Sequence, residues 1–437
     1  MTVRRVMLVV TLVLLVLCAA LAGMLAADWP YFRRVFAMTQ LADAGEWPDT
    51  FYQPVARIDG GGAGAFFPAA APGETTIDPA ALEAAAQWAE AHNSVALLVL
   101  HRGRLQLERY WQGTDAGTPF SGRAMSRSLV GLVFGTAVAD GRLALDDPAS
   151  KYLDEWRGDP RGAITIRQLM QNVSGLAEIE LESPLPAPGA GPLERAVALL
   201  RTAASRNTRL ALGTDFGAAA LSFPLEHEPG GRFAFSNANS QLLGLILERA
   251  TGTDFERYVQ QKLWAPLGAG VGEFYMDRRS GMPAVYCCFR ATPRDWLRVG
   301  SLLASDGVFD GRPLLPRGWV EQMARSTSTV NPLYGLQVWS GRATRGRRGY
   351  VTGSQQGGVP HGEDFVAGDV VWMEGGGGRS IWAVPSQQLV IVRLGRASQT
   401  WDGSVLPNTI LRGLRAPAPA AASASRPARP PLAAASM

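Results

Sequence analysis

Two serines lie at the start of a predicted helix in residues 121–141, SGRAMSRSLVGLVFGTAVADG. A serine hydroxyl becomes a nucleophile when a nearby base takes its proton, and side chains three residues apart share one face of a helix. Ser126 is followed three residues later by Leu129, and Ser128 by Gly131. Neither position carries a base, so no serine–base pair occurs at this spacing.

Residues 121–156 resemble the nucleophile helix and the following LALDDPASKYLDEW segment of the β-lactamase-related serine hydrolases. This family includes class C β-lactamases, DD-peptidases, esterases and 6-aminohexanoate-dimer hydrolase, and carries S-x-x-K at the start of the helix. Here the same frame reads AMSRS, with Gly141 closing the helix as in the family. The resemblance puts Ala124 at the nucleophile position and Arg127 at the lysine position. A guanidinium stays protonated in proteins and cannot act as a general base.

Two further segments resemble family motifs. GGRFAFSNANSQLLGLILERATG at 230–252 is similar to the segment that carries Tyr-x-Asn, so the tyrosine position holds Phe235 while Asn237 remains. GGGGRSIWAVP at 375–385 takes the place of the third motif, commonly G-x-x-G-Q. The resemblance thus leaves no catalytic position intact. It implies a cleft in which the remaining binding residues are Asn237, Gly375, Gly378 and Arg379.

The same resemblance implies an α+β fold of the β-lactamase/transpeptidase type. In this fold an antiparallel sheet is flanked by helices, an all-α lobe is inserted, and the site lies in the cleft between them. Local patterns agree, because strands are predicted at both ends of the domain and helices between them. Hairpins are predicted at 94–113 and 379–395, and capped helices at 78–92 and 292–307.

The N-terminus predicts a membrane anchor. Residues 1–5 include Arg4 and Arg5, and 6–27 are continuously apolar, which is long enough to span a bilayer. Positive charge before the span predicts an exported body on the periplasmic or extracellular side. A cleaved signal peptide is the alternative. We expect residues 28–80 to be an irregular lead-in, 81–413 to form the family domain and 414–437 to be a disordered Pro/Ala-rich tail.

The composition limits other classes of function. The net charge is +4, and the arginines are scattered apart from 342–348, which reads as a solvated loop and not a nucleic-acid site. Cys287 and Cys288 are expected to be strand or packing residues, since no disulfide framework or zinc spacing is visible. We expect no metal and no other cofactor. The expected partners are the membrane and a small-molecule, peptide or cell-wall ligand.

Three interpretations of function remain. The first is an exported, membrane-anchored homologue that has lost serine-hydrolase chemistry and binds a ligand or partner in the old cleft. The second is an active esterase, amidase or peptidase with a non-standard nucleophile, for which Ser128 is the best candidate because it lies one turn beyond Ala124. The third is a purely structural envelope protein.

Overall fold

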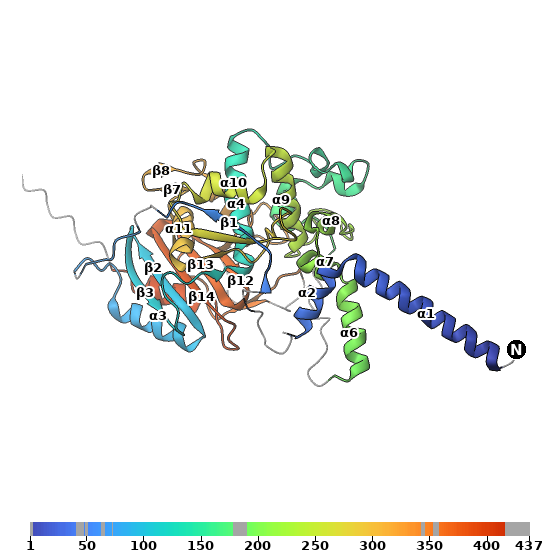
Figure 1. Ribbon diagram of the computed structural model, residues 1–437. Coiled ribbons are helices and arrows are strands. Elements are labelled where there is room, and N and C mark those ends of the chain that lie inside the picture. Colours follow the sequence, from blue (N-terminus) through green and yellow to red (C-terminus); the bar gives the residue numbers. More distant parts are fainter. Residues whose placement is uncertain are drawn as a thin grey trace, which may run out of the picture.

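The computed structural model describes residues 3–40, 48, 51–62, 66–71, 73–177, 190–341, 346–352 and 358–415. At its centre is a six-stranded antiparallel sheet built from both ends of the domain (Figure 1). Its strands, in spatial order, are β3 (Arg104–Tyr110), β2 (Ser94–His101), β14 (Leu389–Gly395), β13 (Arg379–Val384), β12 (Val370–Gly375) and β9 (Trp339–Gly341).

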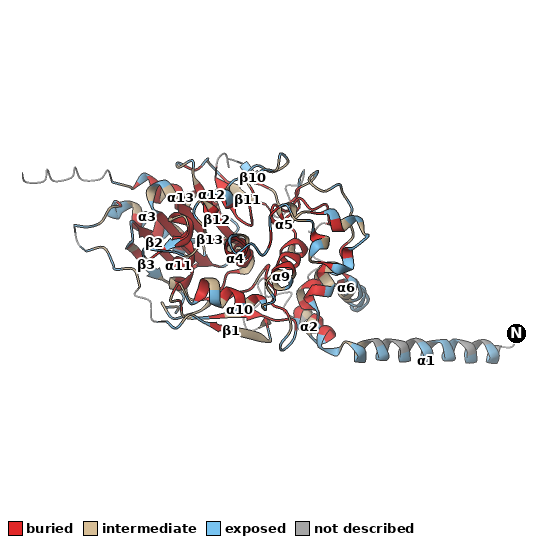
Figure 2. Cartoon of the chain, turned by 90° about the horizontal axis from the view of Figure 1, so that it is seen from above, coloured by how far each residue is buried: buried red, intermediate tan, exposed pale blue. Residues whose placement is uncertain are grey.

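Both faces of this sheet are buried against helices, as Figure 2 shows. Alternate residues of a strand point to opposite faces, so Leu98 of β2 joins one core cluster and Leu97 the other. The helices α3 (Pro79–Ala91) and α13 (Val405–Arg412) pack together over the Leu97 face. The helix α11 (Pro293–Ala304) packs over the Leu98 face, and its core cluster continues into α4 (Ser126–Ala139) and α12 (Trp319–Ala324).

A helical lobe and a smaller sheet complete the fold. The lobe lies on the side of the large sheet away from β3 (Figure 1). Its helices are α5 (Ile166–Met170), α6 (Pro192–Ala204), α7 (Arg206–Leu212), α8 (Phe216–Leu221), α9 (Asn237–Thr251) and α10 (Phe255–Val259), the last continuing as a π-turn. The smaller sheet has the order β1 (Val55–Asp59), β5 (Val271–Tyr275), β6 (Arg290–Ala291) and β4 (Phe120–Ser121). Two short pairs are β7 (Val308–Phe309) with β8 (Arg312–Pro313) and β10 (Gly346–Arg348) with β11 (Val359–His361).

The prediction of an irregular lead-in over 28–80 is wrong for two elements. Helix α2 (Trp29–Gln40) and strand β1 form within it. Strand β1 pairs with β5, more than 200 residues away, and α2 packs its aromatic face on Leu212 of the lobe. Such long-range partners leave no local signal, and the folded body therefore starts well before residue 81.

Several hydrogen bonds hold the helix α2 on the lobe, and three of them come from one arginine. Arg34 donates from Nη1 to the carbonyls of Leu212 (3.0 Å) and Gly213 (2.7 Å), and from Nη2 to that of Asp277 (2.6 Å). The preceding helix α1 (Val3–Ala27) runs into α2 and projects from the body (Figure 1). Among the residues that the structure describes, no helix combines the length and apolar character of a membrane span.

Two other expectations about the chain need comment. Cys287 and Cys288 pack in the larger core cluster, as expected, and they also form a disulfide between adjacent residues, which was not predicted. Adjacent cysteines offer no spacing pattern from which pairing could be read. At the C-terminus, Leu414 bridges to Ile77 and so belongs to the folded domain. The rest of the predicted tail, from 416 onward, lies outside the described residues.

Candidate active-site cleft

The residue at the nucleophile position sits in a tight turn before α4. Ala124 is the middle residue of a 3₁₀ turn over Arg123–Met125, and Arg123 takes the left-handed conformation at φ 50°. A Cβ on Gly122 would lie 2.4 Å from the Trp296 ring, and one on Gly375 would lie 2.2 Å from the Gly122 carbonyl oxygen. Only glycine permits these approaches, which bring the end of β12 against the turn.

The side chain of Ser126 stabilises this turn through two hydrogen bonds. Its hydroxyl donates to the Arg123 carbonyl at 2.8 Å and accepts from the Phe289 backbone N–H at 3.0 Å. Ser128, the alternative nucleophile, is 2% exposed and donates to the Gln337 carbonyl at 2.6 Å. Both serines are therefore engaged in hydrogen bonds to the backbone.

The arginine at the lysine position is buried beside the second motif. Arg127 is 2% exposed, and its guanidinium carbon lies 3.7 Å from the centroid of the Phe235 ring. It donates from Nη2 to the Asn237 side-chain oxygen at 2.8 Å and from Nη1 to the Ser236 carbonyl at 3.5 Å. Burial lowers the pKa of Arg127. Within the described residues, no carboxylate pairs with this guanidinium.

Aromatic rings continue the stack behind Phe235. The Tyr350 ring is stacked on Phe235 with centroids 5.1 Å apart, and Trp339 is stacked at 5.9 Å. Tyr334 meets Phe235 edge-on at 5.7 Å. Burial raises the pKa of Tyr334 to about 12, although the nearby positive charge of Arg127 opposes that shift. A tyrosine hydroxyl thus lies near Arg127, but it comes from residue 334 and not from the second motif.

A second buried arginine ends the stack and, unlike Arg127, has an acidic partner. Arg348 lies 3.8 Å from the centroid of the Trp339 ring and forms an ion pair with Glu374. The Tyr350 hydroxyl donates to the same carboxylate at 2.6 Å and the Trp372 indole N–H at 3.2 Å. Burial alone would raise the pKa of Glu374, but Arg348 and these hydrogen bonds outweigh it and lower the pKa. The prediction that 342–348 is solvated is therefore wrong for Arg348.

The residues of the third motif do not all lie beside Ala124. Gly375 faces the turn that carries Ala124, as described above. Gly378 instead packs toward Trp401, since a Cβ there would lie 2.8 Å from that ring. Arg379 is 6% exposed and donates to the Gly376 carbonyl at 2.7 Å, so it folds back on its own turn. The structure brings Ala124, Arg127, Phe235, Asn237 and Gly375 together, but it orients Gly378 and Arg379 away from them.

Sequence reasoning missed the residues from outside the three motifs that contact Phe235 and Ser236 or continue the aromatic stack to Arg348. They share aromatic or hydrogen-bonding side chains: Asn172, Tyr334, Trp339, Tyr350 and Glu374. Only Glu374 left a signal, because an acid after the apolar run VVWM stands in a strand that is otherwise buried. The others are separated from the motifs by tens of residues and carry no spacing pattern.

Comparison with known proteins decides the family. The Beta-lactamase family model matches residues 80–411, which is about three quarters of the chain. The chain belongs to the beta-lactamase family. The 6-aminohexanoate-dimer hydrolase of Paenarthrobacter ureafaciens is 24% identical over 301 residues, which cover 68% of this chain and 71% of that relative. The resemblance to the β-lactamase-related family that the sequence indicated is thereby confirmed.

Solved structures of other family-like proteins agree on the fold. A Bacillus anthracis structure that carries the name of a 6-aminohexanoate-dimer hydrolase superposes with a TM-score of 0.60 at 18% identity, covering 84% of this chain and 89% of that one. A penicillin-binding protein of Bacillus halodurans gives a TM-score of 0.52 at 15% identity, covering 76% and 100%. These likenesses confirm the predicted β-lactamase/transpeptidase-like fold.

Proposed function

We propose that this beta-lactamase-family protein is a catalytically inactive serine-hydrolase homologue that binds an anionic ligand in the former active-site cleft. The observation that carries the proposal is the position of Arg127, which lies on the Phe235 ring and is hydrogen-bonded to Asn237. The second motif therefore holds a permanent cation at the place where the family has a lysine. A hydrolase needs a base and a nucleophile there instead.

The loss of chemistry is argued from three side chains. Ala124 offers a methyl group and no nucleophile, Arg127 has no basic lone pair, and Phe235 has no hydroxyl. In triad hydrolases, removal of the nucleophile alone costs on the order of 10⁶ in turnover. Ser128 does not replace it, because its hydroxyl is buried and donates to a carbonyl. We therefore expect no turnover through a serine of this cleft.

The anionic character of the ligand is argued from charge and from unsatisfied polar atoms. Arg127 has no carboxylate partner among the described residues. Several buried atoms of this region have no hydrogen-bond partner there either, among them Nε of Arg127, Oγ of Ser236, Nδ2 of Asn172 and the hydroxyl oxygen of Tyr334. Buried polar atoms are normally satisfied by protein, ordered water or ligand, and arginine binds carboxylate and phosphate strongly. A ligand carboxylate would approach past Ala124 and Asn237, both of which are half-buried.

We further propose that the N-terminus anchors the protein in a membrane with the body outside the cytoplasm. The support is the sequence, in which Arg4 and Arg5 precede 22 apolar residues. Topology reporters fused after residue 60 test the proposal and should report export. N-terminal sequencing of the mature protein that begins near Gly23 would show a cleaved signal peptide instead.

Covalent labelling tests the loss of catalysis. The purified full chain is incubated with a fluorophosphonate and with a fluorescent penicillin, and we expect no stoichiometric adduct. The Ala124→Ser variant is the matched sample, since it restores a hydroxyl at the same position. Labelling of the parent chain at any serine, mapped by mass spectrometry, would defeat the proposal.

Ligand binding needs a separate test. The N-acetylated linear 6-aminohexanoate dimer is a suitable probe, because it carries a free carboxylate and no ammonium group and is related to the compound in the name of a relative, 6-aminohexanoate-dimer hydrolase. We expect it to bind the parent chain without being cleaved, and to lose affinity in Arg127→Met. Arg348→Met is the matched control, since that buried arginine already has Glu374 as its partner. Equal affinity in the parent and in Arg127→Met would argue against an anion site in the cleft.

A further inference from the structure

A cavity of about 400 Å³ lies near the start of β12, at the opposite end of this strand from the turn Gly376–Gly378. It is lined by Val371, the second residue of β12, and by Ser340 of the neighbouring edge strand β9. The turn that carries Ala124 contacts Gly375, the last residue of β12. The cavity and the candidate active-site cleft are therefore separated by the length of this strand. The volume falls in the range of small-molecule sites.

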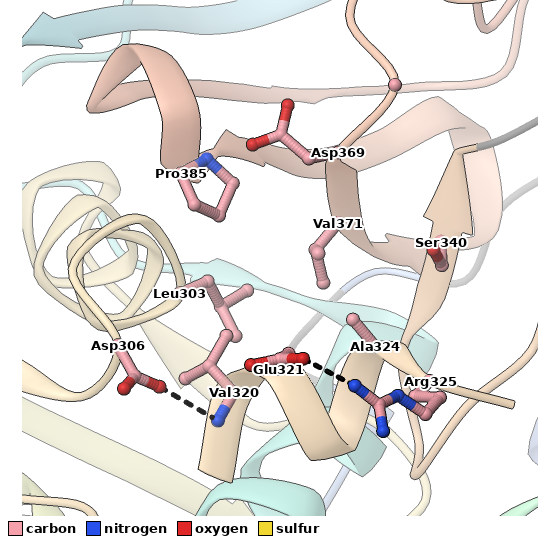
Figure 3. A pocket seen from close by; sticks show the side chains of 11 residues that line it. Leu303, Asp306, Val320, Glu321, Ala324, Arg325, Ser340, Asp369, Val371 and Pro385 are labelled. Carbon is pink, nitrogen blue, oxygen red and sulfur yellow. Dashed lines mark hydrogen bonds and ion pairs between the residues drawn. The ribbon is translucent and has the colours of Figure 1, made fainter. Parts of the chain in front are cut away.

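The floor of this cavity is aliphatic. Leu303 of α11, Val320 of α12 and Val371 are each at most 4% exposed, and Ala324 and Pro385 are half-buried at its sides. Figure 3 shows Pro385 and Asp369 on one side of the cavity and the α12 residues on the other. An apolar floor of this kind favours a ligand with a hydrocarbon body.

The rim is acidic. Asp306, Glu321 and Asp369 line the cavity together with one arginine, Arg325, which pairs with Glu321. Three carboxylates and one guanidinium give a formal charge of −2, whereas the whole chain carries +4. The local charge is thus opposite to that of the protein as a whole.

Two of these carboxylates are held in place by the backbone. Asp306 accepts from the N–H of Gly318 at 2.7 Å and of Val320 at 3.3 Å. Asp369 accepts from the N–H of Ser386 at 2.7 Å and from its hydroxyl at 2.9 Å. A carboxylate has about four acceptor sites, so each retains capacity for a further donor. These negative charges are therefore fixed before any ligand arrives.

A hydroxyl with no hydrogen-bond partner among the described residues lines the cavity. Ser340 is 8% exposed, lines the cavity, and its Oγ makes no hydrogen bond within the described part of the chain. A serine hydroxyl can both donate and accept a hydrogen bond. The hydroxyl therefore offers a donor or acceptor to whatever occupies the cavity.

We propose that this cavity is a second binding site, which takes a small organic amine in its protonated form. The aliphatic floor would hold the hydrocarbon body, the acidic rim would hold the ammonium group, and the Ser340 hydroxyl would give a directional contact. This inference is independent of the ligand proposed for the cleft, because it uses none of the cleft residues and requires the opposite charge.

Calorimetric titration of the full chain with 4-phenylbutylamine tests the charge preference. At pH 7 this probe is a cation, and 4-phenylbutyrate and 4-phenylbutanol are its anionic and neutral counterparts. We expect the cation to bind at least about tenfold more tightly than the anion, and its advantage to shrink as salt is added. Equal affinities, or no binding of the cation, would overturn the proposal.

Variants test the location. Ala324→Trp should fill the cavity and abolish binding, while Gln322→Trp places the same bulk on the exposed side of α12 and should leave it unchanged. Asp369→Asn and Glu321→Gln should each weaken binding roughly two- to fivefold. They also give the answer if Ala324→Trp fails to fold. Unchanged affinity in both charge variants, or in a folded Ala324→Trp, would place the bound amine elsewhere and refute this site.

Discussion

The guanidinium carbon of Arg127 lies 3.7 Å from the centroid of the Phe235 ring. By the resemblance described above, these two positions hold a lysine and a tyrosine in the family. Here the contact is between a cation and an aromatic face. The two substitutions are therefore complementary, because an arginine without the ring would be a buried charge facing an apolar core, and that is costly.

The first prediction measures this complementarity. A double-mutant cycle of Arg127→Met and Phe235→Leu should show a coupling free energy of about 1–2 kcal/mol in chemical denaturation. The cycle of Arg209→Met and Tyr31→Leu is the control, because the Arg209 guanidinium lies farther from its ring, at 4.6 Å, and Arg209 is exposed. A coupling no larger than that of the control pair would mean that Arg127 and Phe235 changed independently.

The second prediction concerns restored chemistry. The triple variant Ala124→Ser, Arg127→Lys, Phe235→Tyr regains a nucleophile, a base and a hydroxyl at positions that the fold brings together. We expect weak hydrolysis of an activated ester, absent from the parent. The double variant without Ala124→Ser is the control and should stay inactive. Equal rates in the triple and the double variant would show that the turn no longer presents residue 124 to a substrate.

The third prediction concerns acid stability through His361. Burial, with Arg348 next in importance, lowers the pKa of His361 from 6.5 to about 4. The unfolded chain therefore binds a proton between pH 6.5 and 4 that the folded chain does not, so this group destabilises the fold as pH falls through that window. The loss is on the order of 3 kcal/mol. In His361→Leu, the free energy of unfolding should therefore change less between pH 6.5 and 4 than it does in the parent chain.

The choice of leucine follows from the surroundings of that histidine. The His361 ring packs against Phe365 and Trp372, and neither of its nitrogens has a hydrogen-bond partner among the described residues. His92→Gln, at a half-buried histidine, is the control variant. If the parent and His361→Leu lose stability in parallel between pH 6.5 and 4, this histidine does not set the acid limit.

The fourth prediction concerns Glu248, whose contribution to the stability of the fold changes with pH in the direction opposite to that of His361. Burial raises the pKa of Glu248 from 4.5 to about 7, while its hydrogen bond from the Phe255 N–H opposes that shift. Below pH 4.5 the protonated group stabilises the fold, and this contribution is lost as pH rises through 7. Glu248→Gln keeps the acceptor without the charge, so it should stabilise the protein at pH 8 by a few kcal/mol relative to pH 4. Thermal unfolding at the two pH values measures the difference.

Much of the fold was predictable from the sequence because its signals are local. The cap residues Asp78 and Thr292 do begin α3 and α11, and both predicted hairpins form. Strand β1 was not predictable, because its partner β5 lies more than 200 residues away. The same holds for α2, whose aromatic residues are explained only by the lobe on which they pack.

The candidate site divides in the same way. The family motifs placed Ala124, Arg127, Phe235 and Asn237 in one frame, and the structure brings them together. The spacing of a motif does not determine the orientation of a side chain. The hydrogen bond from Arg379 to the carbonyl of its own turn could therefore not be predicted. The pairing of Arg348 with Glu374 was hidden for another reason, since a run of arginines is usually solvated and only tertiary contact buries one of them.

The clamp that Arg34 makes on the backbone carbonyls of the lobe has a mechanical consequence. Since α1 runs directly into α2, a pull on the N-terminus is transmitted through Arg34 to the ends of α7 and the loop after β5. The large sheet receives no such load through this contact. A pulling force on α1 would therefore act on the lobe that carries Phe235 and Asn237 before it acts on the strands of the large sheet. The cleft residues would be displaced first.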